Sequence, residues 1–454
     1  MNFVNLVNPE TVHRSLSRWP DVDADNLQAF DAADRLLLEH STSELDRLRA
    51  EGIDDPCLVV IGDRYGAIAL PLLAESPAEG ASAVPELRIW QDLATGETAL
   101  EANAARLGIT GFTRIRDDES SSDLYGPELL AGTRLVLLRL PKNLAELAEL
   151  SEAIAEHAHP DVVVLAAGMV KHMTLSMNEV LGADFGTITA SLAKGKARVL
   201  RASSPRPDRG AGRSASGQPR RQSTVEPGTT QKTSQTQEPC QTQEPGQTQA
   251  PEGGSLSFPT REFHEGLGRN GDLSLEVHAH GAVFAGAKVD IGTRFLLEFL
   301  ARMPRVSTAV DLGCGSGVLA TLLAASQPEV RVVACDVSAA AVRSARLTAG
   351  AHGVGDRVLA VHTDALEGFP PASAELILLN PPFHLGHSVH AGAALKLFRA
   401  AAEVLSPGGE LWTVWNSHLG YLPALEKYVG PTEIIGRNKK FTVTRTRRPV
   451  ADPA

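Results

Sequence analysis

Apolar and polar positions in the second half of the chain alternate between short apolar runs and longer amphipathic stretches. The short runs predict buried strands, and the longer segments between them predict helices. The predicted strands are 308–312, 330–335, 358–362, 376–379 and 410–415, and the predicted helices are 295–301, 317–326, 339–350 and 391–405. This alternation is typical of a parallel sheet covered by helices. Residues 258–454 are therefore predicted to form a Rossmann-like α/β domain.

Two flanking segments alternate with a period of two residues. Residues 273–279 predict a half-exposed hairpin ahead of the main sheet, from which His278 and His280 point outward. Residues 441–446 predict an edge strand. The stretch around it, 437–448, holds six basic residues and no acidic one. Such charge either protects a sheet edge or contacts phosphate groups, and both interpretations stay open.

The first half of the chain repeats the same order of elements. Its predicted strands are 58–61, 87–90, 135–138 and 162–165. A loop with only two glycines, 62–66, follows the first of them, and Leu140-Pro141-Lys142 follows the third. We predict a duplicated domain over residues 1–200 that has lost its catalytic residues.

Residues 201–257 separate the two halves and are rich in Ser, Thr, Gln, Pro and Gly. A six-residue polar repeat with regular proline begins at Gln235. Such a sequence cannot bury a core, so we predict a disordered linker.

Composition limits the class of protein. Hydrophobic residues make up 43% of the 454 residues, which is enough for two domains. No apolar run has the length of a membrane span, the first residues do not resemble a signal peptide, and four cysteines lack metal-like or disulfide-framework spacing. We expect a reduced, cytoplasmic, monomeric protein that does not enter a membrane.

The net charge of −11 is concentrated in the first half, where 17 basic residues stand against 31 acidic ones. Residues 258–454 carry 19 basic and 18 acidic residues. A broad basic footprint is therefore absent from the sequence, and any contact with a nucleic acid must use a local patch.

A glycine-rich loop follows the predicted strand 308–312 and precedes a helix. Asp311 opens it, and Gly313, Gly315 and Gly317 alternate along it. Glycine lets a ligand approach the backbone closely, and the G-x-G-x-G spacing differs from the G-x-G-x-x-G of dinucleotide sites. The loop favours a cofactor without phosphate, such as S-adenosylmethionine. The other interpretation is a plain tight turn.

Two aspartates follow the next strands. Asp336 lies 25 residues after Asp311, a spacing at which an acidic residue accepts ribose hydroxyls. Asp364 is expected to accept from an adenine amino group, although either residue also suits a helix N-cap. Ligands of open α/β sheets bind at the carboxyl ends of strands. The predicted cofactor-binding residues are Asp311, Gly313, Gly315, Gly317, Asp336, Asp364 and Asn380.

The tetrapeptide Asn380-Pro381-Pro382-Phe383 follows the apolar run 376–379. The Asn380 side-chain carbonyl and the Pro381 backbone carbonyl offer two acceptors for the protons of a planar exocyclic amine, which orients its lone pair toward a methyl donor. The prolines make the turn rigid, and Phe383 is placed to stack on a base. We predict that these four residues are catalytic through alignment and proximity. A plain proline-rich turn is the other interpretation.

Three histidines follow this motif, His384, His387 and His390. Their spacing suits a metal ion, but no nearby cysteine or carboxylate completes a ligand set. We therefore predict no metal.

The chain resembles the bacterial ribosomal RNA guanine-N2 methyltransferases, class I enzymes with tandem, half-degenerate domains. The matching stretches are 283–295, 311–317, 380–384, 415–419 and 438–441 in the second half, and 168–173 and 194–198 in the first. The resemblance implies S-adenosylmethionine as methyl donor and a guanine exocyclic amine in ribosomal RNA, with the large subunit favoured, as acceptor.

By the same resemblance, Gly313, Gly315, Asp336 and Asp364 contact the cofactor, residues 380–383 contact the guanine, and residues 284–293 lie over the cofactor. The first domain assists folding or docks RNA. The basic residues that it offers for docking are Lys171, Lys194, Lys196 and Arg198. The partner is ribosomal RNA or a ribosomal subunit.

Two further hypotheses remain open on the residues alone. One is methylation of adenine N6 or of a protein glutamine amide, because the same four-residue motif serves these planar nitrogens. The other is an RNA-binding or assembly factor without catalysis.

Overall fold

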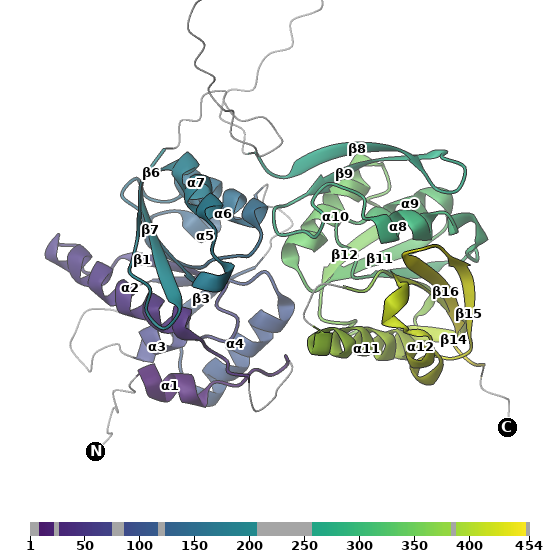
Figure 1. Cartoon of the computed structure of the whole chain (residues 1–454), viewed down its shortest axis with the longest axis horizontal. Coiled ribbons are helices and arrows are strands. Elements are labelled where there is room, and N and C mark those ends of the chain that lie inside the picture. The colour runs from purple at the N-terminus through teal and green to yellow at the C-terminus, as the bar shows by residue number, and fades with distance from the viewer. Residues whose placement is uncertain are drawn as a thin grey trace, which may run out of the picture.

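The computed structural model describes residues 9–21, 27–74, 86–116, 123–206, 257–382 and 387–450. Residues 207–256, most of the predicted linker, lie outside these ranges. Two α/β units stand side by side (Figure 1), and each is built on a seven-stranded sheet. Within the described ranges, no helix has both the length and the apolar character needed to cross a membrane.

The first sheet has the strand order β3-β2-β1-β4-β5-β7-β6. Its strands are β1 (Cys57–Ile61), β2 (Leu87–Trp90), β3 (Phe112–Ile115), β4 (Thr133–Arg139), β5 (Val163–Met169), β6 (Phe185–Ala190) and β7 (Ala197–Pro205). One face packs on α1 (Pro9–Ser15), α2 (Ala32–Ala50), α3 (Ala69–Ala74) and α4 (Ala94–Leu107). The other packs on α5 (Pro127–Leu130), α6 (Leu144–His157) and α7 (Leu175–Asp184). The strand β7 continues past residue 200, where the sequence pattern places the start of the linker.

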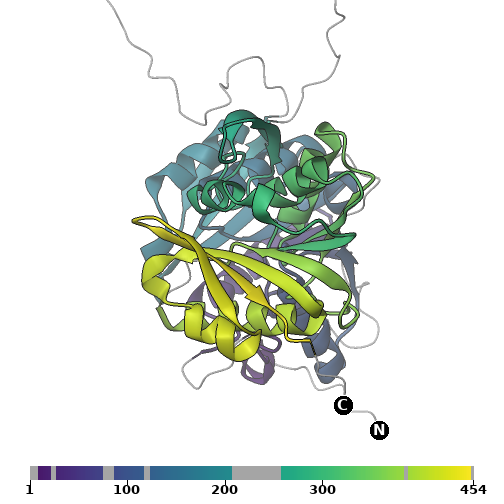
Figure 2. The same ribbon diagram turned by 90° about the vertical axis from the view of Figure 1, so that its right-hand side faces the viewer.

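The second sheet has the order β12-β11-β10-β13-β14-β16-β15. Its strands are β10 (Thr308–Leu312), β11 (Arg331–Asp336), β12 (Val358–His362), β13 (Ala374–Leu379), β14 (Leu405–Asn416), β15 (Thr432–Arg437) and β16 (Phe441–Arg447). Helices cover both faces (Figure 2), with α8 (Ile291–Leu297), α9 (Val318–Ser326) and α10 (Ala339–Ala351) on one and α11 (His387–Val404) and α12 (Leu422–Tyr428) on the other. A separate hairpin, β8 (Thr260–Leu267) and β9 (Leu273–Ala279), precedes this unit. Short 3-10 turns lie at Val170–His172, Leu300–Arg302 and Ser417–Leu419.

The two strand orders correspond position by position, so the predicted tandem Rossmann-like fold is confirmed. The prediction of an edge strand at 441–446 is wrong, because β16 lies between β14 and β15. Its threonines are buried, and two of them bond to neighbouring hydroxyls: Thr442 to Ser417 (2.8 Å) and Thr446 to Thr432 (3.0 Å). Bonded hydroxyls let two of these polar side chains lie inside a sheet, whereas the buried Thr444 hydroxyl has no partner among the described residues.

Acidic partners neutralise part of the basic stretch 437–448. Arg447 pairs with Glu410 (3.0 Å), and Arg445 pairs with Glu433 (2.5 Å). Lys439 and Lys440 are exposed at the turn between β15 and β16. Only part of this stretch is thus available for phosphate groups.

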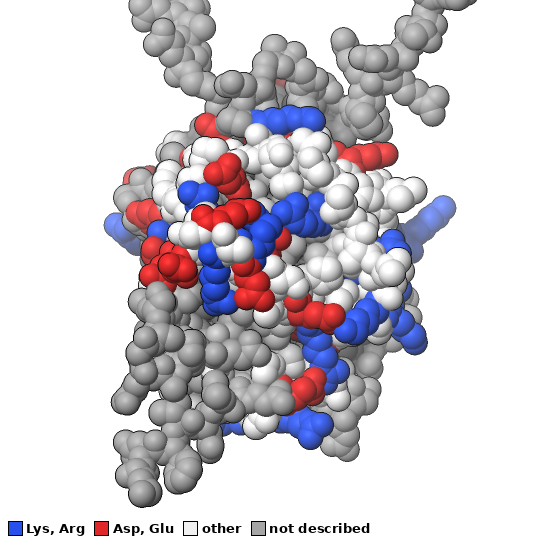
Figure 3. Space-filling view, turned by 90° about the vertical axis from the view of Figure 1, so that its left-hand side faces the viewer, with Lys and Arg blue, Asp and Glu red and all other residues white. Residues whose placement is uncertain are grey.

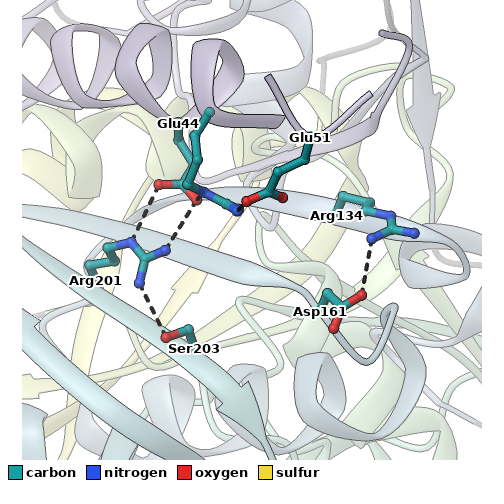
Figure 4. Close-up of polar contacts among 7 residues, drawn as sticks. Glu44, Glu51, Arg134, Asp161, Arg201 and Ser203 are labelled. Atoms are coloured by element: carbon teal, nitrogen blue, oxygen red, sulfur yellow. Dashed lines mark hydrogen bonds and ion pairs between the residues drawn. The ribbon is translucent and has the colours of Figure 1, made fainter. Parts of the chain in front are cut away.

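Some of the acidic residues of the first unit form ion pairs. Arg201 on β7 binds Glu44 on α2, and Arg134 binds Asp161 (Figure 4). Acidic and basic side chains alternate over the face of this unit that points away from the second (Figure 3). Of the basic residues expected to dock RNA, Lys194 pairs with Glu39 (2.5 Å), while Lys171 and Lys196 are exposed. This face therefore does not present one continuous charge.

One apolar cluster runs through both units. It joins Val136 and Leu138 on β4 to Val277 on β9 and to Trp412 on β14. The prediction that His278 and His280 point outward is wrong, because both are buried. The β9 strand lies against α10 and His280 meets Glu149 of the first unit, so both histidines are covered, while Arg261 and Glu262 on β8 stay exposed.

Polar contacts cross the interface at two places. Glu149 on α6 accepts from the Gly281 amide (2.6 Å) and bonds to His280 Nδ1 (2.5 Å). The second place is reciprocal: the Ala94 amide donates to the Val337 carbonyl and the Ala339 amide to the Asp92 carbonyl, both at 2.8 Å. These segments follow β2 and β11, the same strand of each unit, so the units are related by a local pseudo-twofold axis.

In the first unit, a side chain fills the space beside the loop that follows β1. A Cβ on Gly62 would lie 3.3 Å from Cβ of Arg139, the last residue of β4. The Arg139 guanidinium binds Asp31 (2.9 Å) and Asp34 (3.0 Å). Burial raises the pKa of the Asp34 carboxyl to about 7, against the opposing effect of Arg139. Arg139 thus neutralises two carboxylates that would otherwise face each other.

We expect Arg139→Met to lower the free energy of unfolding by roughly 3 kcal/mol at pH 8, because it leaves buried negative charge without a partner. The folded-state pKa of Asp34 lies above its unfolded value of 3.8. The folded protein therefore takes up a proton there as the pH falls below about 7, and the deficit shrinks at pH 5. Urea titration at the two pH values measures both effects.

The matched control is Arg134→Met on the same strand, whose partner Asp161 has a side chain that is 74% exposed. Its cost should stay at about 0.5 kcal/mol at both pH values. A deficit for Arg139→Met that is independent of pH would contradict the role assigned to Asp34.

Candidate active site

The strand register brings three predicted site residues to one edge of the second sheet. Leu312, at the end of β10, pairs with Cys335 on one side and with Leu379 on the other. The next residues along these three parallel strands are Gly313, Asp336 and Asn380. They therefore leave the sheet side by side at its carboxyl edge, where open α/β sheets bind ligands.

The loop after β10 is open on the side of Gly313 and Gly315. Both have positive φ, 75° and 52°, and a Cβ on either would meet no atom within 4 Å. Gly317 differs, because its Cβ would lie 2.6 Å from Cα of Ala345 on α10. The first two glycines thus border free space, and the third lets α9 approach α10.

The two aspartates of the site have different surroundings. Asp311 is buried, and its Oδ2 accepts from the Ala320 amide in α9 (2.9 Å). Burial raises the pKa of Asp311 to about 7. Asp336 accepts from the Gly315 and Ser338 amides, both at 3.0 Å. Burial also raises the pKa of Asp336, and these two N–H groups oppose the shift. Asp311 therefore fastens the loop to α9, whereas Asp336 lies beside Gly315 at the open edge.

The Asn380 amide is held in one orientation. Its Nδ2 donates to Asp290 Oδ2 (3.1 Å) and to Thr293 Oγ1 (3.0 Å). Its Oδ1 is buried and has no hydrogen-bond partner in the described part of the chain. A buried acceptor without a partner is costly, so this oxygen is the polar group of the site that a ligand donor would satisfy.

The remaining predicted residues are partly outside this arrangement. Pro381 is buried and Pro382 is exposed, while Phe383 and His384 lie outside the described residues. The side chains of His387 and His390 are also outside the described part. Asp364, just after β12, forms an ion pair with Lys396 on α11. Its carboxylate is thus engaged by a cation from the helix that follows the Asn380 motif.

Asp290 and Thr293 were not identified individually as site residues from the sequence. Asp290 caps α8, because its Oδ2 accepts from the amides of Gly292 (2.8 Å) and Thr293 (3.4 Å). An aspartate before an apolar helix is a recognisable N-cap. Its second use, as acceptor for Asn380 ninety residues later in the chain, becomes visible only in the fold.

Comparisons with known proteins agree with this architecture. The family model "RLMG N-terminal domain" matches residues 5–206, and "Methyltransferase small domain" matches residues 274–445. The ribosomal RNA large subunit methyltransferases G of Streptomyces avermitilis and of Pseudomonas aeruginosa are each 33% identical to the chain, covering 95% of it and 96% of the relative. The structure of a T. thermophilus 16S rRNA N2 methyltransferase in complex with AdoMet and guanosine aligns with a TM-score of 0.62 at 20% identity. That alignment covers 97% of this chain and all of the other.

The glycines of the loop allow a paired test. Gly315→Ala adds a methyl group toward open space, so it should cost only about 1 kcal/mol of stability but weaken binding of S-adenosylmethionine by more than about tenfold. Gly317→Ala should lower stability by roughly 2 kcal/mol, because the methyl group meets the backbone of α10. Urea unfolding and titration calorimetry separate the two effects. Unchanged cofactor affinity in Gly315→Ala would contradict the prediction that the open loop at Gly313 and Gly315 binds the cofactor.

Proposed function

We propose that Asn380 in the second domain directs methyl transfer to a guanine. The chain belongs to the family of ribosomal RNA large subunit methyltransferase G. The enzyme is an S-adenosylmethionine-dependent methyltransferase that acts on the exocyclic N2 of guanine in ribosomal RNA, with the large-subunit RNA favoured. The unpartnered, buried Oδ1 of Asn380 is the observation that carries the assignment of this residue.

The residues at the sheet edge fit the cofactor. S-adenosylmethionine supplies an electrophilic methyl group on its sulfonium centre. Gly313 and Gly315 offer a backbone surface without side chains, and the Asp336 carboxylate next to them is an acceptor for ribose hydroxyls. Asp311 and Gly317 act indirectly, since they hold the loop on α9 and α10. Asp364 is a further candidate to bind the adenine base of S-adenosylmethionine.

Asn380 aligns the target amine. An exocyclic amine conjugated with a ring is a weak nucleophile, because its lone pair is delocalised. Asn380 Oδ1 accepts one amine proton and the Pro381 carbonyl the other, which turns the lone pair toward the methyl donor. The rigid Pro381-Pro382 turn keeps both acceptors in place. Rate enhancement then comes from alignment and preorganised dipoles.

Asp290 and Thr293 fix the direction of that acceptor. An amide can rotate by 180° and exchange its oxygen for its nitrogen. With Nδ2 bound to a carboxylate and a hydroxyl, the oxygen must face the ligand side. Donation to a carboxylate also polarises the amide and makes Oδ1 a stronger acceptor.

The RNA partner would meet exposed residues near this edge. Phe284 and Ile291, which flank the segment before α8, are 61% and 58% exposed. Lys439 and Lys440 lie on the turn that leads into β16. A Cβ on Gly292 in α8 would lie 3.3 Å from the ring of Phe441, the first residue of β16. Aromatic and cationic side chains of this kind suit stacking and phosphate contact. We propose ribosomal RNA or a ribosomal subunit as the partner, and a cytoplasmic monomer as the active form, since one chain supplies both domains.

We expect Asn380→Ala to lower kcat by roughly 100- to 1000-fold, the cost of losing one preorganised group aimed at the reacting centre. Its Kd for S-adenosylmethionine should stay within about twofold of the wild-type value.

Labelled S-adenosylmethionine is supplied with ribosomal RNA and subunits from cells lacking the gene, and nucleosides are then analysed. N2-methylguanosine is the expected product. Label in N6-methyladenosine or in protein would overturn the substrate, and unchanged turnover would overturn the role of Asn380.

Thr293 provides the matched pair of controls. Thr293→Val removes the hydroxyl at constant shape and should lower kcat roughly tenfold, while Thr293→Ser keeps the acceptor and the rate. In the Asn380→Ala background, Thr293→Val should have no further effect on kcat, because its contribution acts through that amide. Additive losses would show that Thr293 acts in another way.

A further inference from the structure

The catalytically degenerate domain contributes a carboxylate to the loop that carries Asp336. Asp92 follows β2 in the first domain, and its Oδ1 accepts from the Ala340 amide (3.0 Å) and the Ser338 hydroxyl (3.1 Å). Its backbone carbonyl accepts from the Ala339 amide (2.8 Å). One residue of the first domain thus binds three consecutive residues of the second.

These contacts lie at the start of α10. The first turn of a helix leaves backbone N–H groups without partners inside the helix. Ser338 caps the Ala341 amide from its own chain segment (3.2 Å), and Asp92 binds the amides of Ala339 and Ala340 from across the interface. The N-terminus of α10 is therefore completed by the other domain.

The same segment also holds the carboxylate of Asp336, which is proposed to bind the cofactor. The Ser338 amide donates to Asp336 Oδ1 at 3.0 Å, while Asp336 Oδ2 accepts from Gly315. His362, at the end of β12, bonds through Nε2 to the carbonyls of Val337 (2.9 Å) and Asp92 (3.1 Å). His362 and Ser338 thus each bind both Asp92 and the segment 336–338.

We propose that Asp92 is a positioning residue for the cofactor site: it holds Ser338 and the N-terminus of α10 from the first domain, and thereby sets the position of the Asp336 carboxylate. The first domain then acts on cofactor affinity without touching the cofactor. This explains why a domain whose own loop is filled by Arg139 still packs against the carboxyl edge of β11.

The inference rests on the proposed placement of Asp336 in the cofactor site, so that placement is tested beside it. Binding of S-adenosylmethionine to the full-length protein is measured by titration calorimetry, and thermal unfolding is recorded for each variant. Asp92→Ala should raise Kd roughly five- to tenfold, the size of a lost helix-capping interaction. Asp92→Asn keeps an acceptor oxygen and should stay within about twofold. If Asp92→Ala does not fold, Ser338→Ala carries the test: it removes the hydroxyl that donates to Asp92 together with the cap of Ala341, and Ser338→Thr, which keeps the hydroxyl, is its control.

The matched control is Glu149→Gln, which weakens a different polar contact of the same interface. It should lower Tm but leave Kd unchanged. A Kd for Asp92→Ala within twofold of wild type, or an equal rise in Glu149→Gln, would overturn the role of Asp92. If Asp336→Ala also binds normally, the cofactor-site assignment fails as well, whereas a weakened Asp336→Ala beside a normal Asp92→Ala removes only the present inference.

Discussion

The parallel pairing of β10 with β11 on one side and with β13 on the other places the candidate site residues of this protein at one edge of the second sheet. Since Leu312 is in register with both Cys335 and Leu379, the residues that follow all three strands emerge together. Gly313, Asp336 and Asn380 are far apart in the sequence but become neighbours through this pairing. Groups at the starts of α8 and α10 then orient Asn380 and Asp336.

The two domains show how one topology can keep or lose a ligand site. Their sheets share one strand order, and both carry a glycine after the first strand of the unit. In the second domain the space beside Gly313 is free, whereas in the first domain Arg139 lies against Gly62. Arg139 is in turn held by Asp31 and Asp34. The first domain has thus exchanged a ligand cradle for an internal ion-pair network.

The lost site did not make the first domain independent of the second. An apolar cluster continues across the interface, and buried Glu149 and His280 pair within it. At the pseudo-twofold axis, the segments after β2 and β11 exchange backbone hydrogen bonds. In the first domain this segment carries Asp92, and in the second it follows Asp336. The symmetry of the two units therefore brings the degenerate copy into contact with the segment that follows Asp336.

Local sequence determined the elements and most of the chemistry. Apolar runs predicted β10 and β13 within two residues. The glycine loop and the Asn380-Pro381-Pro382 turn stand in contiguous stretches, where glycine permits the positive φ of the loop and proline restricts the φ of the turn. The same pattern did not predict the burial of alternating polar strands. β16 lies inside the sheet, and His278 and His280 are buried. Residues on other elements cover these side chains or bond to them. The link from Asp290 and Thr293 to Asn380, and from Asp92 to Ser338, was decided only by tertiary structure. Hydrogen bonds between residues 90 or 246 positions apart depend on how strands pair and domains pack, and neither is encoded in a local window.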